Sequence, residues 1–194
     1  GIRLYPWGLY MVSDQPVRSF NDRFMPVAQW LGKERSGQAA ALEQRLTTPD
    51  MEEAQSLLES FLEPLIDPDK SDPILFAVLD RLFHMPAEYK VADAVRDSGL
   101  SQRQFERRCM AVTGLSPKRL HVVARFNRVR IRLLLNPALD LHDLMVEAGY
   151  YDYAHFAKDF RQCLGLTPAR FRAWAGRLAA DHGPADVEFL QDNA

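Results

Sequence analysis

The feature that most restricts the fold of this 194-residue chain is an internal duplication in its second half. Segments 91–120 and 141–171 align at an offset of 50 residues, which becomes 51 after an insertion at Tyr151. The matched residues are Gly99 with Gly149, Ser101 with Asp152, Phe105 with Phe156, Gly114-Leu115-Ser116-Pro117 with Gly165-Leu166-Thr167-Pro168, and Arg119 with Arg170. A duplication that preserves so many turn and cap residues predicts one small structural unit, folded twice.

Each copy has the pattern of two helices separated by a tight turn. A short helix, over about 90–97 or 141–148, ends at a glycine that can adopt a left-handed conformation. Ser101 in the first copy and Asp152 in the second then provide a side-chain cap for the next helix. We therefore predict two helix-turn-helix units, because a glycine-containing turn sets consecutive helices at a steep angle.

A third helix in each copy is predicted by a hydroxyl residue followed by proline. Ser116-Pro117 and Thr167-Pro168 fit the N-cap and first helical position. The helix that begins at Pro117 is expected to continue to about Leu135, where Asn136-Pro137 ends it. A helix of that length would join the two units rigidly.

The first half of the chain reads differently. Residues 1–17 are rich in aromatic and β-prone residues broken by Pro6 and Gly8, which predicts a short strand or hairpin. Residues 20–84 carry apolar residues at helical spacing and predict a set of packed helices that form a core or a dimer interface. The predicted fold class is mainly α: two helix-turn-helix units joined by a long helix, preceded by a helical segment with a short N-terminal strand.

Charge is divided sharply along the chain. The formal net charge is only −2, but residues 1–89 carry −6, residues 90–176 carry +7 and residues 177–194 carry −3. A basic block between acidic ones predicts a module that binds a polyanion, attached to segments that do not.

Several other classes of protein are disfavoured. No apolar run is long enough to predict a membrane span, and the N-terminus does not resemble a secretory signal. The chain shows no nucleophile motif and no glycine-rich phosphate loop, so we expect neither enzymatic activity nor a cofactor. Cys109 and Cys163 are expected to be buried thiols in a reducing cytoplasm, with a disulfide or zinc site as the alternative.

The second helix of each copy has one face that suits DNA. An α-helix fits the major groove of B-DNA, and arginine, glutamine, glutamate and alanine can each contact particular base edges. Apolar residues such as Phe105 and Phe156 fall on the opposite face and are expected in the core, together with Cys109, Val112, Phe160 and Leu164. The predicted base-reading residues are Gln102, Arg103, Glu106 and Arg107 in the first copy and Tyr153, Ala154, His155 and Lys158 in the second.

Other residues in the basic block are expected to contact phosphate rather than bases, because backbone contacts position a protein on DNA. They are Ser116, Lys118, Arg119, Arg128, Thr167, Arg170 and Arg172. Ser116 and Thr167 are helix caps first, and helix N-termini also hold phosphate. The alternatives remain that Arg103 and Arg107 form a solvated helix face, that Tyr151 and Tyr153 are partly packed, and that His155 caps or packs.

The stretches GLSQRQFERRCMAVTGLSPKRL, VARFNRVRIRLLL and AGYYDYAHFAKDFRQCLGLTPARFR resemble the AraC/XylS family of bacterial transcription regulators over about residues 85–176. The resemblance implies two recognition helices that enter adjacent major-groove segments on one side of the DNA. By motif position it places base reading on Arg103, Glu106 and Arg107, then on Tyr153, Ala154, His155 and Lys158. Cys109 departs from the family pattern, in which a large apolar residue is usual.

The resemblance also implies a domain organisation and a set of partners. Residues 1–84 would be the remnant of a regulatory and dimerisation domain, 85–180 the DNA-binding domain, and 181–194 a C-terminal tail. The expected function is sequence-specific binding of double-stranded DNA in the bacterial cytoplasm, at the nucleoid. A small-molecule effector bound by the missing N-terminal part, RNA polymerase and a second copy of the chain are further expected partners. The alternative is an effector-binding or dimerisation module whose DNA contacts are incidental.

Overall fold

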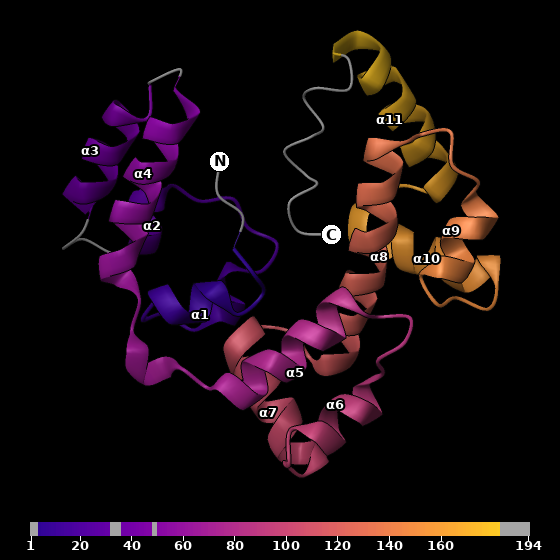
Figure 1. Cartoon of the computed structure of the whole chain (residues 1–194), viewed down its shortest axis with the longest axis horizontal. Coiled ribbons are helices and arrows are strands. Elements are labelled where there is room, and N and C mark those ends of the chain that lie inside the picture. Colours follow the sequence, from indigo (N-terminus) through magenta and orange to yellow (C-terminus); the bar gives the residue numbers. More distant parts are fainter. Residues whose placement is uncertain (1–3, 32–35, 48–49, 183–194) are drawn as a thin grey trace. The chain divides into compact units, whose positions relative to one another are not determined.

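The chain is largely helical in the computed structural model, in which residues 4–31, 36–47 and 50–182 are described. None of these residues is in a β-strand. The α-helices are α1 (Gly8–Val12), α2 (Val27–Leu31), α3 (Ser36–Arg45), α4 (Met51–Leu62), α5 (Pro73–His84), α6 (Val91–Asp97), α7 (Gln102–Thr113), α8 (Pro117–Leu135), α9 (Leu141–Glu147), α10 (Tyr153–Leu164) and α11 (Pro168–His182), shown in Figure 1. The 3-10 helices are η1 (Val17–Phe20), η2 (Glu63–Leu65) and η3 (Pro68–Lys70). The prediction of a mainly α fold is confirmed.

The predicted N-terminal strand is wrong. The carbonyl of Tyr5 accepts a hydrogen bond from the Gly8 N–H at 2.8 Å, which closes a turn that leads directly into α1. The carbonyl of Met11 then accepts from the Asp67 N–H at 2.9 Å, so α1 is held by η3 rather than by a neighbouring strand. The aromatic content of this stretch favours a strand locally, but propensity of this kind is weak and tertiary contacts override it.

The described chain divides into two compact units. Unit 1 comprises Gly1–Pro73 together with Arg103–Ser116, and unit 2 comprises Ile74–Gln102 together with Pro117–Ala194. In unit 1, α2 packs on α3, α3 contacts α4, and α1 contacts η3. None of the helices in the described ranges is both long enough and apolar enough to cross a membrane.

Unit 1 joins an N-terminal segment to the end of α7. The Asn21 side chain donates from Nδ2 to the carbonyl of Gly114 at 2.8 Å, and Arg108 forms an ion pair with Asp72. Asn21 directly follows η1, and its side chain is bound to a partner 93 residues away in the sequence. Gly114 has φ +71°, and an added Cβ would lie 3.1 Å from the Arg18 backbone. A glycine is therefore required here both by conformation and by space.

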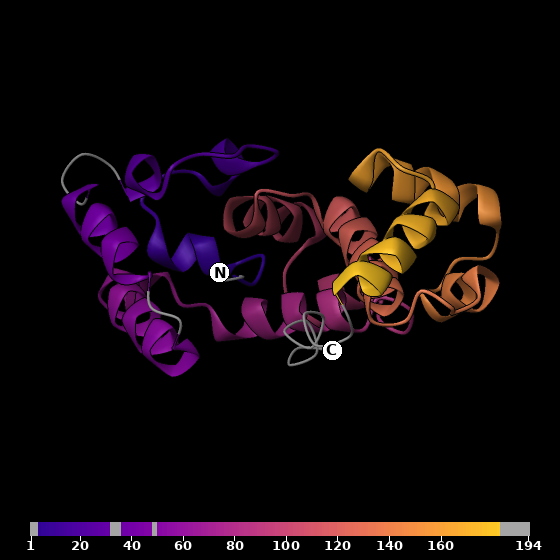
Figure 2. The same cartoon turned by 90° about the horizontal axis from the view of Figure 1, so that it is seen from above.

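Unit 2 contains the second copy of the repeat around one apolar core. In this unit α8 lies beside α10 and α11, and α9 packs on α8 and α10 (Figures 1 and 2). The buried core consists of Val129, Leu133, Leu134, Leu141, Leu144, Met145, Ala148, Tyr150, Phe156, Phe160, Phe171 and Ala175. Aromatic rings from α10 and α11 meet in it, with the Phe160 and Phe171 centroids 5.5 Å apart. Leu164 was predicted in this core but is 39% exposed, because α10 ends at that residue and the chain turns away.

A polar cluster orients α6 on α5 within unit 2. The Tyr89 hydroxyl donates to Asp97 Oδ2 at 2.9 Å, and Arg81 Nη1 donates to the same oxygen at 3.1 Å. The Arg81 guanidinium also lies 4.2 Å from the centre of the Tyr89 ring. Burial, and then the hydrogen bond to Asp97, raise the pKa of Tyr89 to about 12, so its hydroxyl remains a donor at neutral pH.

The connection between α5 and α6 contacts both α8 and the second copy of the repeat. His121, on α8, has Nε2 2.8 Å from the carbonyl oxygen of Pro86. Burial lowers the pKa of His121 below its ordinary value, and the hydrogen bond to Pro86 opposes that shift only in part. At the turn after α9, a Cβ added to Gly149 would lie 3.0 Å from Cα of Ala87. The loop therefore packs directly against the turn of the second helix-turn-helix unit.

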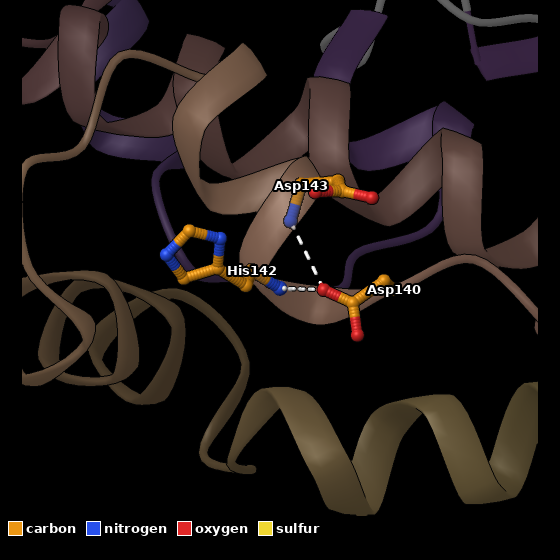
Figure 3. A group of neighbouring side chains, drawn as sticks. All are labelled: Asp140, His142 and Asp143. Carbon is orange, nitrogen blue, oxygen red and sulfur yellow. Dashed lines mark hydrogen bonds between the residues drawn. The ribbon is translucent and has the colours of Figure 1, made fainter.

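Side-chain caps begin several of the helices. Asp152 accepts from the His155 N–H at 2.8 Å and caps α10 as predicted. Asp140 caps α9 in the same way, accepting from the N–H groups of His142 and Asp143 (Figure 3). For α4 the cap is Asp50, which accepts from the N–H groups of Glu52 and Glu53. Gly99, Gly114, Gly149 and Gly165 all have positive φ, between 67° and 76°, at matching points of the repeat.

We predict that Gly149→Ala destabilises unit 2 more than Gly165→Ala. Both glycines have φ near +75°, so each substitution costs about 1–2 kcal/mol from the left-handed backbone. Only at Gly149 does the added methyl meet a neighbour, and crowding of that kind costs about another 1–3 kcal/mol. Urea unfolding of both variants measures the difference. Equal destabilisation would contradict the close approach of Ala87.

We also predict that lowering the pH from about 7.5 to 5.5 destabilises the wild-type chain more than His121→Gln. The folded-state pKa of His121 is depressed, so the unfolded chain binds more protons as the pH falls through about 6.5. Stability is therefore lost on acidification in that window, and glutamine removes this contribution while still donating to Pro86. Urea unfolding at the two pH values tests it, and identical losses in both proteins would refute it.

Candidate nucleic-acid interface

The first candidate reading helix is α7, whose two faces differ as predicted. Phe105 and Cys109 are 0% exposed and Val112 is 5% exposed, so they form the buried face. Gln102, Arg103, Glu106 and Arg107 are all exposed and cluster in the first half of the helix. The periodicity thus placed the four proposed base-reading residues on the accessible side of the helix.

The small residue Cys109 takes part in a group of local hydrogen bonds at the end of α7. Its Sγ lies 3.4 Å from the carbonyl oxygen of Leu115. The Thr113 hydroxyl donates to the Cys109 carbonyl at 2.8 Å and accepts from the Leu115 N–H at 3.1 Å. Burial raises the pKa of the Cys109 thiol to about 11, so it stays protonated. Both cysteines are free thiols, and Cys163 is half-buried.

The second candidate reading helix is α10, which begins directly after the Asp152 cap. Tyr153, Ala154, His155 and Lys158 are exposed, and the ring of Tyr153 is supported edge-on by Phe156 with centroids 5.7 Å apart. Tyr150, in the turn before α10, is only 4% exposed. Tyr153 and His155 are therefore partly packed as well as exposed. Each ring contacts an aromatic residue of the core and also has an accessible side.

A buried charged pair lies beneath α10. Arg125, on α8, donates from Nη2 to Asp159 Oδ2 at 3.1 Å, and the two side chains are 10% and 6% exposed. The Arg125 guanidinium lies 4.2 Å from the centre of the Tyr150 ring. His155 Nε2 is 3.4 Å from the same Asp159 oxygen. Burial raises the pKa of Tyr150, so that its hydroxyl stays protonated beside Asp159.

The proposed phosphate-binding residues differ in their local contacts. Lys118 and Arg170 are exposed, whereas Ser116, Arg119, Arg128, Thr167 and Arg172 are half-buried. Arg119 donates from Nη2 to the carbonyl of Gln162 at 3.4 Å, and Arg128 lies 3.9 Å from Glu88. Thr167 Oγ1 accepts from the Arg170 N–H at 3.3 Å, so Thr167 caps α11 as predicted.

Three further exposed residues in this region were missing from the predicted set. Tyr151 is 96% exposed in the turn before α10. Its status as the inserted residue of the repeat was the signal that could have identified it. Arg161 and Gln162 line a shallow hollow on α10 together with Ala154, Ala157 and Lys158. Arg161 lies three residues after Lys158, which is the spacing of one helix face.

One group of side chains outside this surface has metal-ligand chemistry. Among the described residues, Asp140, His142 and Asp143 bring ligand atoms within 4.8 Å of one another, and all three are exposed (Figure 3). Asp140 is already committed to two backbone N–H groups, which lower the pKa of its carboxyl. The cluster is therefore explained as the start of α9.

Comparison with known proteins agrees with the repeat and its geometry. A family described as "Helix-turn-helix domain" matches residues 94–173, which cover the first copy from residue 94 and the whole of the second. The HTH-type transcriptional regulator ExsA of Pseudomonas aeruginosa is 32% identical over 89 residues, which are 46% of this chain and 32% of ExsA. The chain thus spans about a third of the length of that relative. No solved structure matches significantly.

The duplicated turn, the paired helices and the domain match define a helix-turn-helix domain over residues 94–173. This domain match and the similarity to ExsA support the resemblance to the AraC/XylS family of bacterial transcription regulators. The resemblance identified from the three sequence stretches is thereby confirmed.

We predict that Arg125→Met destabilises the chain by about 3–5 kcal/mol, since it leaves the Asp159 carboxylate buried without its cation. The matched control is Arg132→Met on the same helix. Arg132 pairs with Glu147 at 2.9 Å, but both side chains are 43% exposed, so the loss should not exceed about 1 kcal/mol. Urea unfolding compares the two, and similar losses would show that the Arg125 pair is not effectively buried.

Proposed function

We propose that the chain binds double-stranded DNA in a sequence-specific way and regulates transcription, with α7 and α10 in adjacent segments of the major groove. The observation that carries this proposal is the domain match over 94–173, which covers the first copy from residue 94 and the whole of the second. Each copy buries its phenylalanine and exposes the polar residues at the start of its second helix. Those N-terminal residues are the ones that meet base edges when such a helix docks.

The two helices would use different chemistry. Arginine forms bidentate hydrogen bonds with guanine, and glutamine does so with adenine, so Gln102, Arg103 and Arg107 suit direct readout of the major groove. Glu106 can accept from cytosine or orient a neighbouring arginine. Tyr153, His155 and Lys158 offer two rings and a cation, while Ala154 suits the thymine methyl group. The second copy would therefore read its half of the site partly through apolar contact.

Affinity would come mainly from the phosphates. Residues 90–176 carry a formal charge of +7, and each phosphate neutralised releases counterions. Ser116, Lys118, Arg119, Arg128, Thr167, Arg170 and Arg172 are the proposed contacts. We further propose a cytoplasmic location and no enzymatic role. A small effector, RNA polymerase and a second copy of the chain are proposed partners, and the regulatory and dimerisation role belongs to residues 1–84.

Selection from random duplex DNA tests this function. We expect two short motifs about one helical turn apart, because one turn separates successive accesses to the major groove on one side of DNA. Arg103→Ala should cost about 1–3 kcal/mol of binding free energy, concentrated at one base pair.

The matched control for Arg103→Ala is Lys118→Ala, which removes one positive charge from another exposed position. It should weaken all sequences nearly equally and reduce the slope of log affinity against log salt by about 1. Equal losses on all sequences in both variants would contradict base reading by Arg103. A complete lack of sequence preference would favour the alternative, a dimerisation or effector-binding module with incidental DNA contact.

A further inference from the structure

The buried Arg125–Asp159 pair beneath α10 also contacts His155, one of the proposed base-reading residues. Asp159 is 5% exposed and cannot touch DNA, yet its Oδ2 lies 3.1 Å from Arg125 and 3.4 Å from Nε2 of His155. His155 precedes Asp159 by four residues, so the two side chains share one side of the helix. The His155 side chain is 49% exposed, so its ring joins the buried pair to the surface.

The Asp159 carboxylate fixes what the facing histidine nitrogen must be. An ionised carboxylate accepts hydrogen bonds and donates none, and the Asp159 carboxylate forms an ion pair with the Arg125 guanidinium at 3.1 Å. Nε2 of His155 must therefore carry a hydrogen to bond with it. A hydrogen bond from Nε2 to the carboxylate selects the Nε2–H tautomer of the neutral imidazole. Nδ1 then carries no hydrogen and is an acceptor.

The ring is also fixed in orientation. Tyr150 is packed in the core and meets the His155 ring edge-on, with centroids 5.4 Å apart and planes at 81°. The His155 backbone N–H is bound to the Asp152 cap, which holds the residue at the first turn of α10. Among the described residues, Nδ1 of His155 has no hydrogen-bond partner.

We propose that Asp159 is a positioning residue for DNA recognition: it holds His155 as the Nε2–H tautomer and so leaves Nδ1 as an acceptor for a base amino group. The exocyclic amines of adenine N6 and cytosine N4 are the donors that the major groove offers. A guanine or thymine at the same position presents acceptors there and would be disfavoured. This inference rests on the proposed function, because it assumes that α10 enters the groove.

The tautomer is measured without DNA. Nitrogen-15 spectra of the labelled full chain, recorded where the titration shows a neutral ring, distinguish a protonated from an unprotonated nitrogen at His155. The proposal requires a protonated Nε2 and an unprotonated Nδ1 in the wild-type protein. An Nδ1–H tautomer overturns it, and this readout needs no variant that could fail to fold.

Two variants of equal charge change then separate positioning from electrostatics. Asp159→Asn and Asp152→Asn each remove one negative charge at or beside the same helix, but asparagine still caps at position 152. We expect Asp159→Asn to shift His155 toward the Nδ1–H form and to lower discrimination at one base pair about tenfold or more. Asp152→Asn should leave both the tautomer and the discrimination unchanged.

DNA-binding measurements on a His155 variant identify the same base pair independently. His155→Ala should lose discrimination at the pair that Asp159→Asn affects, and the double variant should lose no more than either single one. Undiminished discrimination in His155→Ala overturns the proposal. A wild-type protein with no sequence preference overturns the proposed function and the base contact with it, while the spectra still decide whether Asp159 sets the tautomer.

Discussion

Both copies of the repeat depend on a backbone reversal that only glycine adopts easily. Gly99 and Gly149 end the first helix of each copy, and Gly114 and Gly165 end the second, all with positive φ. A left-handed residue costs other side chains about 1–2 kcal/mol, so these four positions fix where each helix stops. The direction in which α7 and α10 leave their turns follows from those stops. The backbone conformation at these glycines therefore determines where the exposed residues at the start of α7 and α10 lie.

Local sequence chemistry predicted the second half of the chain well. Helix periods, glycine stops and caps such as Asp152 act within a few residues, so one sequence contains all that they need. The first half was less predictable for the same reason. The stretch around α1 is held by Asp67, and Asn21 is committed to Gly114, so distant partners decided both conformations. Neither Asp67 nor Gly114 can be identified as a partner from the local sequence pattern around α1 or Asn21.

The sequence predicted the exposed residues of the candidate interface but not the buried residues beneath them. The spacing of Phe156 and Phe160 was enough to place His155 and Lys158 on the accessible side of α10. It gave no reason to bury Asp159, because an acidic residue between apolar ones is ordinarily solvated. Its burial depends on Arg125, 34 residues earlier on α8, and a charge buried with its partner is detected only in three dimensions.

The chemistry of the two thiols gives the fold a built-in reporter. Cys109 is 0% exposed with a pKa raised to about 11, whereas Cys163 is half-buried on α10. Alkylating reagents attack thiolates, so Cys109 can react only when α7 detaches transiently from its surroundings. The rate at which Cys109 is alkylated in the native protein would therefore report local opening of the first copy. This rate does not depend on whether the second copy opens.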